Sequence, residues 1–150
     1  ELLEEAPGLD LIVAPVGGGG LISGTVLAAP GARVIGAEPA LADDAAASKR
    51  LGEVQPQRPP VTIADGLRGQ LGLLTWPFVR DRVERIVTVS EEEIAWAMRL
   101  VWERMKIVIE PSAAVPVAAV LSAEFRGLHG GARVGIILSG GNVDLDALPW

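Results

Sequence analysis

The chain has 150 residues, 49% of them apolar, and its 13 basic and 19 acidic side chains give a net charge of −6 at pH 7. A chain of this size and composition can bury a hydrophobic core, and the lack of a basic run argues against nucleic acid as a partner. It has no cysteine, which excludes disulfides, thiolate metal sites and cysteine nucleophiles. No apolar run reaches the roughly 18 to 20 residues of a membrane span. We therefore expect a cytoplasmic protein without a membrane partner.

The first residues predict a strand, a helix and a second strand. An apolar run at Asp10–Pro15 is followed by glycines at 17–20 and by a helix-compatible stretch, Leu21–Ala29. The next apolar run, Arg33–Ala37, is apolar on both faces, as expected for a central strand of a parallel sheet that helices cover on both sides. These segments predict a βαβ unit.

The rest of the chain repeats this alternation after a loop-rich stretch. Residues 38–72 are rich in Ala, Asp, Pro and Gln and predict loops with one helix, at Ala42–Leu51. Beyond them we expect strands at Arg85–Val89 and Val134–Leu138, a helix that follows the capping box of Ser90 and Glu93, and a helix from Ser112 towards Phe125. Together the elements predict one α/β unit over residues 1–150, an open, mostly parallel, twisted sheet with a layer of helices on each face.

The four glycines at 17–20 are the strongest functional signal. They lie between a predicted strand and a predicted helix, where backbone N–H groups can converge at the positive end of the helix dipole without obstruction by Cβ atoms. Phosphate is the usual ligand of such a loop, and a permissive turn is the alternative. Leu21 and Ile22 stand where an ATP-binding P-loop has Lys and Ser or Thr, which excludes that motif.

A dinucleotide-binding fingerprint matches the same loop only in part. Such a fingerprint has glycines at its first, third and sixth places, and the sixth place counted from Gly17 is Ile22. Glu38 ends the second predicted strand, where a ribose-binding acid would lie. The NAD-binding Rossmann domain of an oxidoreductase therefore stays open as an alternative.

A second glycine pair follows the last predicted strand, within Leu138–Asn142. The carboxyl ends of parallel strands meet at one edge of a sheet, where α/β proteins bind their ligands, so both glycine loops could face one site. Ser139 offers a hydroxyl that can bond a ring nitrogen without imposing a charge. An ordinary turn is the alternative.

Taken in order, these motifs resemble the fold-type II, or β-family, enzymes that use pyridoxal 5′-phosphate (PLP) and share the fold of the tryptophan synthase β chain. Within that family the sequence is most similar to the serine racemases and the serine/threonine dehydratases. The resemblance covers essentially the whole chain and rests on Val16–Leu21, Gly36–Pro39, Ala42–Asp44, Thr62–Gly66, Leu100–Lys106, Glu110–Pro111 and Leu138–Leu145.

The resemblance implies a role for several residues around the cofactor. The ring nitrogen of PLP would bond to Ser139, while Glu110 and Gly66 would support the site near the cofactor. The cofactor phosphate would be held by Gly17, Gly18, Gly19, Gly20 and the amide of Leu21.

The resemblance also implies two further sites and a partner. Glu38, Asp44 and the carbonyl of Ala42 would bind Mg²⁺ or Ca²⁺, which prefer hard oxygen ligands; a solvated acidic loop is the alternative. Lys106 and Asn142 match positions that bind a nucleotide at a subunit interface, which implies ATP as an effector and a homodimer.

PLP chemistry needs a lysine that binds the cofactor and moves the Cα proton. The chain has only two lysines, Lys49 and Lys106, and neither lies in a context that resembles that of the catalytic lysine of the family. The resemblance therefore implies the carboxyl-terminal half of a longer enzyme, and we expect the chain to be inactive by itself.

The expected activity belongs to the complete enzyme. It would act on L-serine or L-threonine by removing the Cα proton, followed either by β-elimination to a 2-oxo acid plus ammonia or by reprotonation. The alternative that is not an enzyme is a stand-alone phosphate-binding domain without catalysis.

Overall fold

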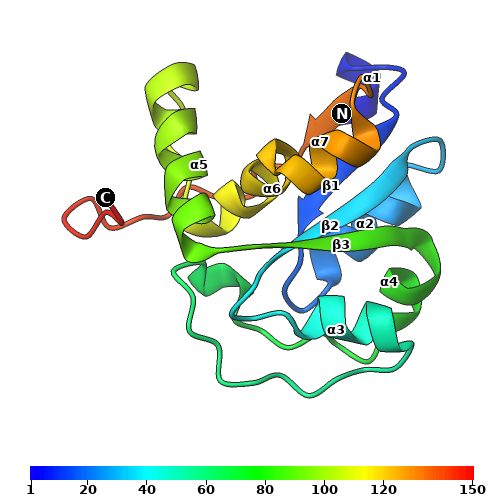
Figure 1. The fold of residues 1–150 in the computed structure, drawn as a ribbon. Helices are drawn as coiled ribbons and strands as arrows, with labels where there is room; N and C mark the ends of the chain where they lie inside the picture. The colour runs from blue at the N-terminus through cyan, green and yellow to red at the C-terminus, as the bar shows by residue number, and fades with distance from the viewer.

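The computed structural model describes residues 1–150, and its centre is a four-stranded parallel sheet. The strand order is β3-β2-β1-β4, so the first strand lies in the interior of the sheet (Figure 1). The elements in chain order are α1 Leu2–Glu5, β1 Leu11–Pro15, α2 Gly20–Ala28, β2 Arg33–Pro39, α3 Asp44–Leu51, the 3₁₀ turn η1 Asp65–Leu67, α4 Trp76–Arg82, β3 Val83–Val89, α5 Glu91–Met105, α6 Pro111–Leu121, α7 Ala123–His129 and β4 Val134–Ile136.

Alternate residues of β1 face two separate cores, as the two-residue period of a strand requires. Leu11 and Val13 belong to a core with α5, α6 and α7, and Ile12 and Ala14 to a core with α2, α3 and α4. Figure 1 shows these two groups of helices on opposite sides of the sheet. The predicted three-layer α/β fold is confirmed.

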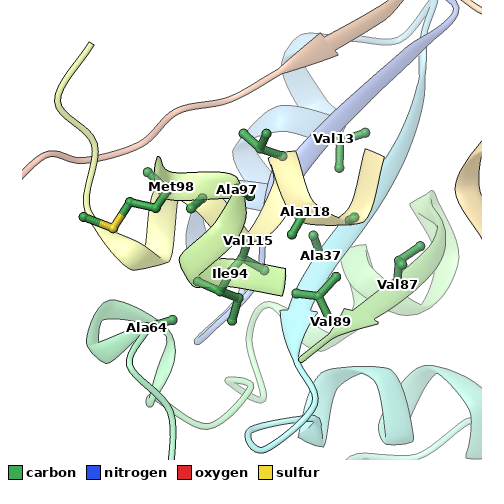
Figure 2. Close-up of a cluster of buried hydrophobic side chains, with 14 of the residues drawn as sticks. Val13, Ala37, Ala64, Val87, Val89, Ile94, Ala97, Met98, Val115 and Ala118 are labelled. Carbon is green, nitrogen blue, oxygen red and sulfur yellow. The ribbon is translucent and has the colours of Figure 1, made fainter. Parts of the chain in front are cut away.

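The larger core lies between the sheet and the pair α5 and α6. In Figure 2, Ile94 and Met98 of α5 and Val115 of α6 belong to the same cluster as Val13 and Val89 of the sheet. Alanines make up much of the buried face of α6. Because their side chains are short, this helix can pack closely against both α5 and the sheet.

The capping box predicted at the start of α5 is present. The Ser90 Oγ accepts a hydrogen bond from the Glu93 amide at 3.2 Å, and the Glu93 carboxylate accepts one from the Ser90 amide at 2.8 Å. Two amides that the helix itself cannot satisfy are thus paired.

The other predicted elements differ from the structure mainly in their ends, with one exception. The single helix predicted from Ser112 towards Phe125 is wrong, because α6 ends at Leu121 and Ser122 is extended. The Ser122 side chain then accepts from the Phe125 amide at 3.1 Å and begins α7. Neither the short α1 nor α4, which packs against α2, was predicted.

None of the helices combines the length and the apolar character that crossing a membrane would require.

Candidate functional site

A cavity of about 310 Å³ opens where β1 and β4 end, at the carboxyl edge of the sheet. It brings together the two glycine loops that the sequence suggested would face one site. The residues that line it are Pro15, Gly17, Gly18, Gly19, Gly20, Leu21, Gly66, Leu67, Glu110, Ser112 and Ser139. All the residues predicted to surround the cofactor therefore lie around one cavity.

The first glycine loop presents unused backbone donors to this cavity. The amides of the five residues from Gly17 to Leu21 donate no hydrogen bond within the protein. Gly19 is the N-cap of α2 with a φ of +84°, a left-handed conformation that favours glycine. Five free N–H groups at the positive end of a helix form a binding site for an anion.

A different segment holds the outer side of the same loop. The Gly18 carbonyl accepts a hydrogen bond from the Thr75 hydroxyl at 2.7 Å and another from the Gly72 amide at 3.2 Å. Sequence reasoning missed Thr75, because a contact between residues 57 positions apart leaves no local pattern in a sequence.

Ser112 is a second cavity residue that sequence reasoning missed. Its side chain is buried, and its Oγ accepts a hydrogen bond from the Gly66 amide at 3.0 Å. The bond joins the first turn of α6 to η1, so that Gly66 is held at the edge of the cavity. The signal that could have identified Ser112 in the sequence is its place: it is a hydroxyl residue directly after Glu110 and Pro111, at a predicted helix start.

Glu110 ties the second glycine loop to the start of α6. Its carboxylate accepts a hydrogen bond from the Asn142 amide at 3.0 Å, and its own amide donates to the Gly140 carbonyl at 3.1 Å. A Cβ atom at Gly140 would lie 2.6 Å from the Glu110 carboxyl carbon, so a larger residue there would require the Glu110 side chain to move. The contact holds the loop that carries Ser139 beside the cavity.

Glu38 lies under the first turn of α3. Its side chain is 1% exposed, and its two carboxylate oxygens accept from the amides of Ala45 at 3.0 Å and Ala46 at 2.8 Å. Burial raises the pKa of this carboxyl to about 8, although both amide bonds oppose the shift. A carboxylate enclosed in this way is not accessible to a ribose, which argues against the NAD alternative.

The other two predicted cation ligands lie at the start of the same helix. Asp44 is buried, and its carboxylate accepts from the Leu71 amide at 2.8 Å; burial raises its pKa. Ala42 and Asp44 line a separate cavity of about 300 Å³, which Arg50 and Arg58 also line and Glu38 does not. No group of three or more His, Cys, Asp or Glu side chains is placed so that it could hold a metal ion.

The remaining predicted residues lie outside the cavity between the glycine loops. Lys106 is exposed at the end of α5 with a φ of +62°, and Asn142 is exposed in the second loop. The Lys49 ammonium donates to the Val79 and Arg80 carbonyls at the end of α4, and burial lowers its pKa. Neither lysine lines the cavity.

The site thus offers five backbone donors for an anion, together with a serine and a supporting carboxylate that line the same cavity. Residues 1–140 match the family of pyridoxal-phosphate dependent enzymes. The chain belongs to that family.

Several relatives within the family are similar over the whole chain. A β-hydroxyaspartate dehydratase of Paracoccus denitrificans is 51% identical over 100% of the chain and 48% of its own length. A serine racemase of Rattus norvegicus is 48% identical over 100% of the chain and 47% of its own length. The crystal structure of the Dictyostelium discoideum serine racemase superposes with a TM-score of 0.90 and 49% identity, over 96% of this chain and 47% of that one.

The similarity supports the predicted fold and family. The chain spans about half the length of the curated relatives that it matches.

Proposed function

We propose that this chain supplies the phosphate-binding part of a PLP-dependent serine/threonine dehydratase or serine racemase. The observation that carries the proposal is the row of five free amides from Gly17 to Leu21, in residues that line one cavity together with Ser139. The matched family uses pyridoxal phosphate, and a dianionic phosphate is the type of ligand that such a row of amides binds.

The cavity residues fit the two polar ends of PLP. The amides of Gly17–Leu21 would hold the phosphate, and the Ser139 hydroxyl would bond the ring nitrogen. Because a hydroxyl carries no charge, Ser139 does not favour a protonated ring as a carboxylate would. When bound, PLP supplies the electron sink that stabilises negative charge at the substrate Cα.

Two further residues of this chain would hold the site in shape. Glu110 binds the Asn142 amide and so fixes the loop that carries Ser139. The Ser112 hydroxyl binds the Gly66 amide and keeps η1 at the rim of the cavity. Both would thereby position groups that contact the cofactor.

The proposed substrates are small amino acids with a hydroxyl on Cβ. L-Serine and L-threonine have this group, and so does β-hydroxyaspartate, the compound in the name of one relative. Loss of the Cα proton and of the β-hydroxyl, followed by hydrolysis, converts one L-serine into one pyruvate and one ammonia. Return of the proton to the opposite face of Cα gives D-serine instead.

The test uses the protein that carries this chain at its natural length. We expect it to bind PLP with an absorbance band that added L-serine alters, and to form pyruvate, 2-oxobutanoate or D-serine. Oxaloacetate formed from β-hydroxyaspartate would assign it to that branch of the substrate class. A protein that binds NAD but not PLP, or that binds PLP without acting on any of these amino acids, would contradict the proposal.

We also propose that Glu38, Asp44 and the Ala42 carbonyl bind Mg²⁺ or Ca²⁺. Support comes from two adjacent buried carboxyls whose pKa values burial raises, since a cation would stabilise their charged forms. Added Mg²⁺ should raise the Tm of the wild type but not of the Asp44→Asn variant. An equal shift in both proteins would contradict this site.

We also propose a nucleotide site at Lys106 and Asn142 and a homodimer. Lys106 and Asn142 are exposed and so are accessible to ATP. We expect ATP to change the activity of the wild type and to have less effect on Lys106→Ala, and size-exclusion chromatography to show a dimer. A monomer whose activity ATP does not change would contradict both.

A further inference from the structure

We propose that Thr75 is a positioning residue for the cofactor phosphate. By binding the Gly18 carbonyl on the outer side of the glycine loop, it directs the Gly19 amide towards the cavity. This inference rests on the proposed binding of the PLP phosphate by the amides of residues 17–21.

The contact between Thr75 and the glycine loop is close and specific. The Thr75 Oγ1 lies 2.7 Å from the Gly18 carbonyl oxygen and 2.9 Å from the Gly72 carbonyl oxygen. A Cβ atom placed on Gly19 would lie 2.6 Å from the same Oγ1. The loop and the Thr75 side chain are therefore packed directly against each other.

The geometry of one peptide bond links this contact to phosphate binding. The chain has no cis peptide bond, and in a trans peptide the carbonyl of one residue and the amide of the next point in opposite directions. The Gly18 carbonyl points to Thr75, so the Gly19 N–H points away from it. That amide is one of the donors without a partner in the protein, and Gly19 lines the cavity.

The segment that carries Thr75 is itself anchored. Leu71 is buried, and its amide donates to the Asp44 carboxylate at 2.8 Å. The Gly72 amide adds a second bond to the Gly18 carbonyl, and the Trp76 amide closes the turn onto the Gly72 carbonyl at 2.9 Å. Thr75 thus holds the loop from a rigid support, which is what a positioning role requires.

The hydroxyl is the part of Thr75 that matters. Its proton can be donated to the Gly18 or the Gly72 carbonyl, whereas the methyl group of a valine would face both carbonyl oxygens without donating to either. Thr75→Val therefore removes the interaction at nearly constant volume, and Thr75→Ser retains it. Thr88→Val is the matched control, because Thr88 is exposed on β3 and does not line the cavity.

The experiment measures the Kd of PLP and of pyridoxal, which lacks the phosphate, for the apo form of the full-length protein. We expect Thr75→Val to raise the Kd of PLP about three- to tenfold, the contribution of an ordinary hydrogen bond. The Kd of pyridoxal should not change, and Thr75→Ser and Thr88→Val should match the wild type for both ligands.

The outcomes separate this inference from the proposed function. If the wild type binds PLP no better than pyridoxal, the proposed phosphate site itself fails. If the wild type prefers PLP and Thr75→Val keeps that preference in full, or weakens both ligands equally, the role of Thr75 is refuted. Should Thr75→Val not fold by circular dichroism, Thr75→Ala takes its place in the same comparison.

Discussion

Gly19 shows how one residue can shape a whole binding loop. Its φ of +84° is left-handed, and an added Cβ would lie 2.6 Å from the Thr75 Oγ1 and 2.9 Å from the Leu71 Cδ1. Both the backbone conformation and the lack of space therefore require glycine. The amides on either side keep their direction only while this conformation persists.

Gly19→Ala should destabilise the protein and weaken cofactor binding. A residue other than glycine in a left-handed conformation costs about 1–3 kcal/mol, and relief of the contact with Thr75 would shift the loop. We expect the free energy of unfolding in urea to fall by at least this amount and the Kd of PLP to rise.

Gly24→Ala is the control for this substitution. Gly24 lies in α2, and an added Cβ would meet nothing within 4 Å. Alanine there should leave the Kd of PLP unchanged and raise the free energy of unfolding by about 0.5–1 kcal/mol, because glycine is a poor helix residue. Similar losses of stability in both variants would show that the left-handed conformation is not what requires Gly19.

The raised pKa of Glu38 should make the stability of the protein depend on pH. Burial raises its pKa from 4.5 to about 8, so between these values the folded protein holds a proton that the unfolded chain has released. The free energy of unfolding should therefore fall as the pH rises from about 4.5 to about 8, by up to about 1.4 kcal/mol per pH unit.

Glu38→Gln removes this titration and should make the fall with pH shallower. The measurement is urea unfolding at several pH values across the window, with EDTA present so that no divalent cation binds the carboxylate. Glu92→Gln, on an exposed position of α5, should keep the slope of the wild type. Parallel slopes for the wild type and Glu38→Gln would contradict a raised pKa.

At the scale of single residues, much of the candidate site could be predicted from the sequence. The residues proposed to hold the cofactor come from short motifs, such as the four consecutive glycines and the pair after Ser139, that lie beside strand ends. Ser112 and Thr75 could not be found in this way, because their roles are hydrogen bonds to residues 46 and 57 positions away.

Among the elements, α5 depends most visibly on a local sequence pattern. Its capping box pairs two backbone amides through the side chains of Ser90 and Glu93. Ser90→Ala should lower the free energy of unfolding by about 1 kcal/mol, measured by urea unfolding. Ser90→Asn, which keeps an N-cap acceptor, should recover most of the loss; an equal loss in both would show that the cap is not the cause.

The elements that sequence reasoning missed are those whose limits depend on tertiary contacts. Helix α4 has seven residues, too few to be stable without packing, and its place depends on contacts with α2 and β3. The break between α6 and α7 depends on Ser122, whose side chain can cap a new helix although its neighbours are compatible with a continuous one.

At the scale of the whole molecule, the sheet brings residues from both halves of the sequence to one cavity. Strand β1 lies beside β4, so the loops after these strands are neighbours although more than a hundred residues separate them. The alternation of strands and helices made this arrangement predictable, since parallel strands share one ligand-binding edge.

Lys49 allows a test of where the catalytic lysine lies. Its ammonium binds two carbonyls in the last turn of α4, and Lys49 is not among the residues that line the cavity. Lys49→Met in the full-length protein should therefore keep PLP absorbance and turnover and lose only about 1 kcal/mol of stability. Loss of the cofactor band in a variant that remains folded would instead place Lys49 at the cofactor.

The use of backbone donors in the glycine loop has a consequence for mutational tolerance. An N–H group is present whatever the side chain, so no substitution except proline deletes a donor. In a saturation mutagenesis experiment with selection for cofactor binding, substitutions should therefore be tolerated least where main-chain shape is set, at Gly19 and at Thr75, which binds the neighbouring carbonyl. Positions such as Leu21, which contributes only its amide, should accept many residue types.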